Sequence, residues 1–94
     1  MFYISGFYKF KKINRIKKNK EILESYFIKN LIRGTIIISG EGINGTLSAK
    51  KKNLKSVLKK IKTTFKFNKF DSINLSKNKF QPFHRGKIKI KKEV

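Results

Sequence analysis

Residues 36–45, IIISGEGING, contain a glycine pattern that could bind a nucleotide. Gly40, Gly42 and Gly45 follow the spacing G-x-G-x-x-G, in which glycines let the backbone approach a pyrophosphate at a helix N-terminus. That chemistry needs a helix directly after the last glycine and an acidic residue about 20 positions further on. Here the strand-like stretch TLSA follows, and the nearest acid is the more distant Asp71. The sequence therefore argues against a dinucleotide site, and we expect no bound cofactor.

Asn44 and Gly45 favour a different use of this stretch. The dipeptide Asn-Gly is typical of two-residue hairpin turns, because both residue types tolerate a positive φ angle. We expect the segments before and after this dipeptide to pair as antiparallel strands, with Glu41 and Gly42 beside the turn. Glu41 is then either a solvated acid or a contact to a substrate or partner domain. A lone carboxylate has no partner for acid–base catalysis.

His84 and Arg85 form the second group of residues with usable chemistry. His84 is the single histidine, no acids gather near it and the chain has no cysteine, so we expect no metal site and no cysteine nucleophile. Two uses of His84 stay open: a loop histidine hydrogen-bonded to backbone, or a contact to RNA or a partner domain. Arg85 offers a planar fork for phosphate, and Arg33 is the second such candidate.

The charge of the chain favours a polyanionic partner such as RNA or DNA. The formal charge is +20, from 25 basic and 5 acidic side chains, and weak salt-sensitive attraction to nucleic acid follows from it. Lysine greatly outnumbers arginine, however, and an A/T-rich genome would also produce this composition. Lys87, Lys89 and Lys91 alternate with isoleucines, which predicts a strand with a lysine stripe on one face.

The apolar periodicity predicts two amphipathic helices. The first runs from about Glu21 to Arg33, with Gly34 as its C-cap, and the second covers residues 50–66. Their lysine-rich outer faces are either solvated or in contact with phosphate. The expected core stripe of the first helix consists of Ile22, Leu23, Tyr26, Phe27, Leu31 and Ile32.

The remaining segments predict strands, which makes residues 1–94 one small α+β domain. The order is β-α-β-β-α-β with a further C-terminal strand, the ferredoxin-like pattern of an antiparallel sheet with two helices on one face. Phe7, Tyr8 and Phe83 could stack RNA bases on the open face or pack in the core. The expected strands are residues 2–10, 35–39, 46–49, 72–76 and 87–91.

Two motifs give the chain a family resemblance. They are GTIIISGEGINGTLSA (34–49) and PFHRGKIKIKKEV (82–94). In this order and separation they resemble the N-terminal domain of the bacterial rhodanese-domain proteins that hydroxylate the wobble uridine of tRNA. That family carries an E-G-I-N-G-T turn and a P-F-H-R-x-K-[VI]-K-[LI]-K-x-E segment. FYKF (7–10) also fits the family's first strand, so the resemblance covers essentially the whole chain.

The resemblance implies an acylphosphatase-like fold and a part in the oxygen-dependent conversion of wobble uridine to 5-hydroxyuridine. In the family a cysteine-bearing rhodanese domain follows, whereas this chain has no cysteine and ends near the expected junction. We therefore expect it not to be catalytic alone, with tRNA and a separate rhodanese-domain chain as its partners. The RNA-binding candidates are His84, Arg85, Arg33, Lys87, Lys89 and Lys91.

Two other functions stay open at this point. The fold class suggests a small acylphosphatase, for which Asn14 and Arg15 follow the first strand, although no glycine-rich cradle precedes them. Alternatively, the chain is a degenerate basic fragment without activity. No secretory signal and no long apolar run are present, so we expect a cytoplasmic protein without a membrane segment.

Overall fold

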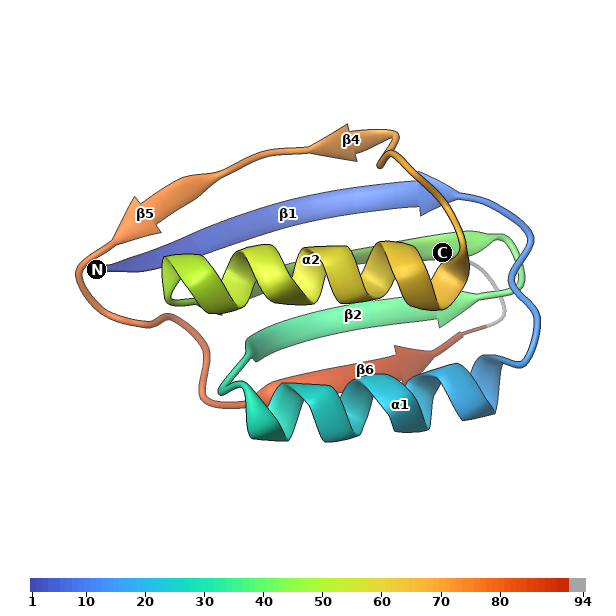
Figure 1. The fold of residues 1–94 in the computed structure, drawn as a ribbon, viewed down its shortest axis with the longest axis horizontal. Helices are drawn as coiled ribbons and strands as arrows, with labels where there is room; N and C mark the ends of the chain where they lie inside the picture. The colour runs from blue at the N-terminus through green and yellow to red at the C-terminus, as the bar shows by residue number, and fades with distance from the viewer. Residues whose placement is uncertain (92–94) are drawn as a thin grey trace.

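The computed structural model describes residues 1–91; the last three residues of the second motif lie outside the described part. Elements follow in the order β1–α1–β2–β3–α2–β4–β5–β6 (Figure 1). Their bounds are β1 Phe2–Phe10, α1 Ile16–Lys29, β2 Arg33–Ser39, β3 Gly42–Ala49, α2 Lys51–Phe65, β4 Ser72–Ile73, β5 Ser76–Asn78 and β6 Gly86–Ile90.

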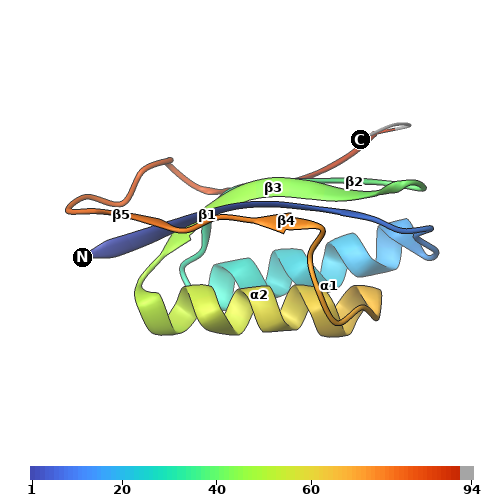
Figure 2. The same cartoon turned by 90° about the horizontal axis from the view of Figure 1, so that it is seen from above.

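The strands form one sheet, and both helices cover the same face of it. The strand order is β4–β1–β3–β2–β6, and β5 also pairs with β1. Figure 2 shows α1 and α2 below the sheet and no helix above it. This two-layer arrangement confirms the predicted ferredoxin-like fold. None of the helices in residues 1–91 is long and apolar enough to cross a membrane.

The core lies between the sheet and the helices. Alternate residues of the central strands point toward the helices, as the two-residue period of a strand requires. The helix predicted over residues 50–66 is confirmed as α2, and its apolar stripe is buried except for the half-exposed Leu58. The fully buried apolar side chains are Leu23, Ile36, Ile38, Ile43, Leu47, Leu54, Val57 and Ile61.

The sheet is mixed, where the sequence predicted an antiparallel one. β6 pairs parallel with β2, in the register Ile36 with Ile88. The reason is the occupancy of the sheet edges: β4 and β5 already pair with one edge of β1, and β3 with the other. The free edge of β2 is therefore the place left for the last strand. The connection that follows β5 carries the chain across the end of the sheet to reach it (Figure 1).

The hairpin between β2 and β3 is confirmed, but its predicted turn is wrong. Ser39 pairs with Gly42, so Gly40 and Glu41 form the turn. Asn44 and Gly45 lie inside β3 and pair with both neighbouring strands. The physical reason is register: this pairing puts Ile36, Ile38, Ile43 and Leu47 together on the buried face.

The first helix begins and ends earlier than predicted. α1 covers Ile16–Lys29, and Asn30 is its C-cap. Leu31 has a positive φ of 53° and is 74% exposed, so it belongs to a turn and not to the core. Ile22, 37% exposed, also lies outside the core. Gly34 is a residue of β2 and not a helix cap.

The strand predicted over residues 72–76 is divided into β4 and β5. Asn74 lies between them and bonds to β1 through its side chain and its backbone. Its Oδ1 accepts the Gly6 N–H at 3.0 Å, and its own N–H donates to the Gly6 carbonyl at 3.0 Å. A side chain thus replaces one ladder bond at this point, which interrupts the strand.

Candidate nucleic-acid interface

The open face of the sheet presents rows of side chains that run across the strands. In one row Tyr8 is opposite Asn44, Asn44 is opposite Ile37, and Ile37 is opposite Lys89. These positions alternate with the buried core residues, so their side chains point away from the helices. The parallel row two residues along each strand contains Gly6, Thr46, Thr35 and Lys87. Each row thus ends in a lysine on β6.

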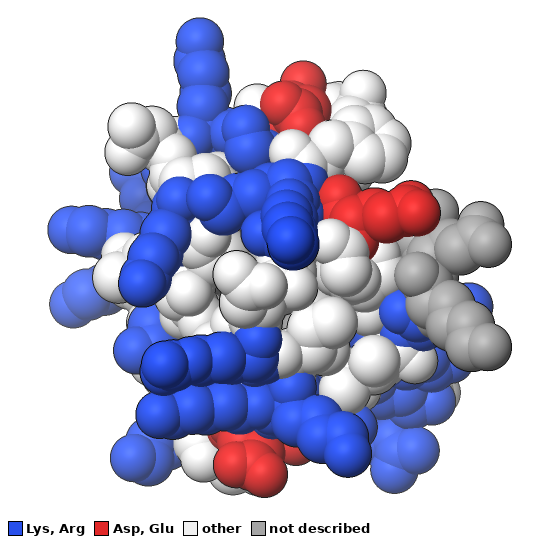
Figure 3. Space-filling model, turned by 90° about the vertical axis from the view of Figure 1, so that its right-hand side faces the viewer, with Lys and Arg blue, Asp and Glu red and all other residues white. Residues whose placement is uncertain are grey.

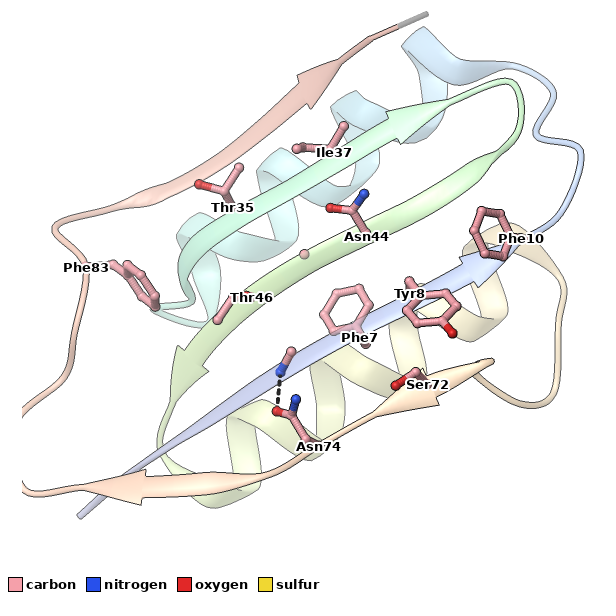
Figure 4. A pocket seen from close by; sticks show the side chains of 12 residues that line it. Phe7, Tyr8, Phe10, Thr35, Ile37, Asn44, Thr46, Ser72, Asn74 and Phe83 are labelled. Carbon is pink, nitrogen blue, oxygen red and sulfur yellow. Dashed lines mark hydrogen bonds between the residues drawn. The ribbon is translucent and has the colours of Figure 1, made fainter. Parts of the chain in front are cut away.

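A shallow groove of about 720 Å³ lies over these rows. Figure 4 shows its lining side chains, which come from β1, β2, β3, the β4 region and the loop before β6. Asn44 and Thr46 project from β3 in the middle of the groove, while Asn74 borders it. The residues that line the groove include both apolar and polar side chains, a combination that suits a flat molecule with polar edges.

Aromatic side chains flank the groove. Tyr8 is 41% exposed, Phe10 64% and Phe83 45%. Tyr8 and Phe10 contact each other edge to face, with ring centroids 5.3 Å apart. Phe7, in contrast, is 5% exposed and packs against Phe70 in the core. Of the predicted stacking candidates, Tyr8 and Phe83 are therefore accessible to a ligand and Phe7 is not.

The predicted lysine stripe lies along the edge of this face. Lys87 and Lys89 are exposed on β6, whereas Ile88 between them is buried. Lys91 follows the end of β6 and is exposed as well, and its N–H donates to the Ile38 carbonyl at 2.9 Å. Among the described residues none of the three forms an ion pair. Their charges are therefore available to an anionic partner.

Arg33, His84 and Arg85 gather where β2 and β6 begin. Arg33 Nη1 donates to the Phe83 carbonyl at 3.4 Å, which ties the loop before β6 to β2. Arg33 and Arg85 border one surface depression next to α1. His84 is exposed, and the described structure shows no backbone hydrogen bond to its side chain. The structure thus brings the arginines together at one end of the lysine stripe.

The residues of the predicted motif turn lie in two different places in the structure. Gly40 and Glu41 form the exposed hairpin turn, in which the Glu41 N–H donates to Ser39 Oγ. Gly42 has a φ of 153°, and a Cβ there would collide with the Lys9 carbonyl oxygen. Asn44 lies on the open face instead. Of the motif, Asn44 and Gly45 line the groove, whereas Glu41 and Gly42 do not.

Asn14 and Arg15, the residues considered for an acylphosphatase, lie at the other end of the molecule. They border a basic recess at the start of α1, together with Lys11, Lys18 and Lys66. Figure 3 shows this end, where mostly basic side chains, with some acidic ones among them, surround an uncharged centre. Arg15 has a left-handed backbone (φ 53°), and the first turn of α1 contains no acid.

Asp71 closes the end of β1 near Phe10. Its Oδ2 accepts the Phe10 N–H at 2.7 Å, and Lys9 Nζ lies 3.4 Å from its Oδ1. The backbone hydrogen bond from Phe10, assisted by Lys9, holds the pKa of Asp71 below its ordinary value. Residues 1–91 contain no cluster of side chains suited to a metal ion.

The groove contains residues that were not among the predicted site residues, and Gly6, Thr46 and Asn74 are examples. Gly6 within a strand is a sequence signal for close approach of a ligand or backbone, and its position opposite Thr46 follows only from the register. Asn74 comes from a segment predicted as a plain strand. No periodicity could place its side chain beside β1.

A protein-family model described as the UPF0176 acylphosphatase-like domain matches residues 2–94. The chain belongs to this family. The resemblance seen in the two sequence motifs is thereby confirmed. The chain is also 61% identical to the tRNA uridine(34) hydroxylase of Pelagibacter ubique strain HTCC1062 over 94 residues, which are 100% of this chain and 31% of that protein. It therefore spans less than a third of this relative's length.

Solved structures share the fold of this UPF0176 domain. The acylphosphatase from Bacillus subtilis has a TM-score of 0.64 at 13% identity, over 94% of this chain and 98% of that one. Full-length HypF has a TM-score of 0.68 at 13% identity, over 99% of this chain and 12% of that one. At such identities the likeness concerns the fold alone, and it confirms the acylphosphatase-like architecture.

Proposed function

We propose that this chain is the RNA-binding domain of a system that hydroxylates the wobble uridine of tRNA, and that the open face of its sheet contacts the tRNA. The supporting observation is the exposed lysine stripe beside an aromatic groove, in a chain so similar to a tRNA uridine(34) hydroxylase. The oxidation itself is assigned to a rhodanese-domain partner and not to this domain.

The lysine stripe supplies the electrostatic part of the interaction. Lys87 and Lys89 lie on one side of the edge strand β6, about 6.7 Å apart along it, and Lys91 follows directly after the strand. Ammonium groups so arranged attract a phosphate backbone without reading its sequence. Arg33 and Arg85 extend this positive edge and add guanidinium forks that bind phosphate in a bidentate manner.

The test is binding of a tRNA anticodon stem-loop at about 150 mM salt, a concentration at which weak non-specific attraction is largely screened. The variant Lys87→Gln/Lys89→Gln/Lys91→Gln is expected to bind roughly tenfold or more weakly. A matched control, Lys52→Gln/Lys55→Gln/Lys59→Gln, removes as many charges from exposed positions of α2. It is expected to retain most of the affinity.

Equal losses in the two variants would contradict the proposal. They would mean that only the net charge of the domain matters, which is the behaviour of a basic fragment without a defined site. Equal affinity for the stem-loop and for a DNA duplex of the same length would argue for the same conclusion.

A further inference from the structure

A hollow on the open face lies over Gly6, in the middle of β1. A Cβ at this position would meet Asn74 Oδ1 and Nδ2 at 3.4 Å and Thr46 Oγ1 at 3.6 Å. These are ordinary contact distances, and the φ of Gly6 is not positive, so neither space nor backbone conformation demands glycine here. Glycine weakens a strand and often marks close approach of a ligand. The missing side chain is what leaves the hollow open.

Asn74 gives the hollow a hydrogen-bond donor of fixed direction. Its Oδ1 is engaged, because the Gly6 N–H donates to it at 3.0 Å. A backbone N–H needs an acceptor, so the oxygen must occupy this position and the Nδ2 amide must face the groove (Figure 4). In the described residues this Nδ2 has no acceptor. It is poised to donate to a carbonyl oxygen of a ligand.

The other walls of the hollow suit a flat aromatic ligand. Tyr8 provides an accessible ring on the same strand, and its phenol lies at the Ser72 side of the groove (Figure 4). Asn44 and Thr46 add an amide and a hydroxyl from β3, and the described residues show no hydrogen bond to either side chain. A ring stacked on an aromatic side chain, with polar groups at its edge, is how proteins bind unpaired bases.

The charge at the far end of the rows favours RNA as the occupant. The row through Gly6 ends at Lys87, and the row through Tyr8 ends at Lys89. Three strand spacings separate β1 from β6, about 14 Å, a span that a few nucleotides can bridge. A base over Gly6 would therefore have its backbone run toward the lysine stripe. An acidic protein segment would satisfy the lysines but does not in itself supply a flat ring for the accessible face of Tyr8.

We infer that the hollow over Gly6 is a nucleobase pocket, in which an unpaired base stacks on Tyr8 and accepts a hydrogen bond from Asn74. This inference rests on the proposed function, since it defines the part of the RNA that the open face binds. A base inside a paired stem would not fit, because its edge and faces are already engaged.

The test uses a single-stranded uridine heptamer and a paired RNA stem of the same length. Two variants remove the pocket: Tyr8→Leu takes away the stacking ring, and Gly6→Val fills the hollow with a residue favoured in strands. Each is expected to weaken binding of the heptamer about tenfold and to leave the stem unaffected. Phe80→Leu is the control, because Phe80 is 78% exposed and does not line the groove.

Nuclear magnetic resonance of the wild-type domain gives a readout that needs no variant. Adding the heptamer should shift the backbone signals of Gly6 and Thr46 and the side-chain amide signal of Asn74. Unchanged signals there, with shifts confined to β6, would overturn the pocket. Thermal unfolding first confirms that both variants fold. If both folded variants then bind the heptamer as tightly as the wild type does, the pocket is also overturned.

The lysine-stripe variant, measured in the same assay, separates the two proposals. If the lysine-stripe variant loses affinity for RNA while Tyr8→Leu and Gly6→Val do not, the nucleobase-pocket inference is wrong and the RNA-binding function stands. If none of the three variants changes RNA binding, both are wrong. If the pocket variants bind RNA normally but no longer bind a rhodanese-domain partner, the hollow is a protein-docking site and the inference fails.

Discussion

Gly42 illustrates how a single residue fixes the geometry of the sheet. It follows the β2–β3 turn and lies so close to β1 that a Cβ would collide with the Lys9 carbonyl oxygen. We expect Gly42→Ala to lower the free energy of unfolding by roughly 2–4 kcal/mol, because the backbones must separate or the strand must distort. Urea unfolding measures the difference.

Gly40 provides the matched control for this prediction. It lies two residues earlier in the same hairpin, its φ is not positive, and nothing lies within 4 Å of a Cβ added to it. Gly40→Ala should therefore change the free energy of unfolding by less than about 0.5 kcal/mol. Similar losses in the two variants would contradict the close approach at Gly42.

The residues of the candidate site could be predicted only where local pattern decides their position. Lys87 and Lys89 alternate with apolar neighbours, so their place on an exposed face follows from the sequence. Asn44 and Gly45 carry the strongest turn signal in the chain, yet cross-strand packing of the isoleucines outweighs it. Asn74 could not be found, because its role depends on a strand about 70 residues away in the sequence.

In α1, apolar side chains occur both on the face that packs in the core and on the exposed face, so apolar residue type alone does not identify the core face. Leu23 is fully buried, and Ile28 is 78% exposed on the same helix. Leu23→Ala should lower the free energy of unfolding by about 2–5 kcal/mol, through lost burial and the cavity left behind. Ile28→Ala should have an effect within about 0.5 kcal/mol. A large effect of Ile28→Ala on unfolding would mean that α1 is rotated from its assigned position.

Asp71, in the segment after α2, should make the free energy of unfolding depend on pH. Its pKa is lowered in the folded protein from the ordinary value of 3.8, chiefly by the Phe10 N–H. A group with a lowered folded-state pKa stabilises the fold above its unfolded-state pKa, and this contribution disappears as the pH falls through the folded-state pKa. We therefore expect the stability difference between wild type and Asp71→Asn to be largest near neutral pH and to shrink below about pH 4.

Chemical denaturation at several pH values measures this difference. A stability difference that stayed constant down to about pH 2 would mean that the Asp71 charge contributes nothing through the Phe10 hydrogen bond.

Helices and strands with a long, regular alternation of apolar and polar residues could be predicted from the sequence. Elements whose pattern is interrupted could not. β1 and α2 follow their sequence periodicity almost to the residue. α1 begins earlier because a left-handed Arg15, which no pattern announces, sets its start. β6 was predicted as a strand, but its parallel pairing depends on which sheet edge the preceding segments leave free. Topology of this kind follows from the whole chain and not from a local segment.

For the whole molecule, the salt dependence of RNA binding separates contact at a defined lysine stripe from attraction by net charge alone. If the lysine stripe contacts phosphates, log affinity for single-stranded RNA should fall with log salt, and replacing one of these lysines should reduce the slope by about 0.7. Replacing Lys52 on α2 should leave the slope unchanged. A salt titration of wild type, Lys89→Gln and Lys52→Gln compares them directly, and equal slopes for the first two would argue against phosphate contact by β6.

We propose that the open face serves tRNA wobble-uridine hydroxylation, and nucleoside analysis of cellular tRNA is the direct test. Cells that lack the gene are complemented with the wild type, with the Lys87/Lys89/Lys91→Gln variant or with the α2 control variant. We expect that 5-hydroxyuridine at the wobble position disappears without the gene, returns with the wild type and the α2 control, and stays low with the lysine-stripe variant. Unchanged 5-hydroxyuridine in cells without the gene, or full restoration by the lysine-stripe variant, would contradict it.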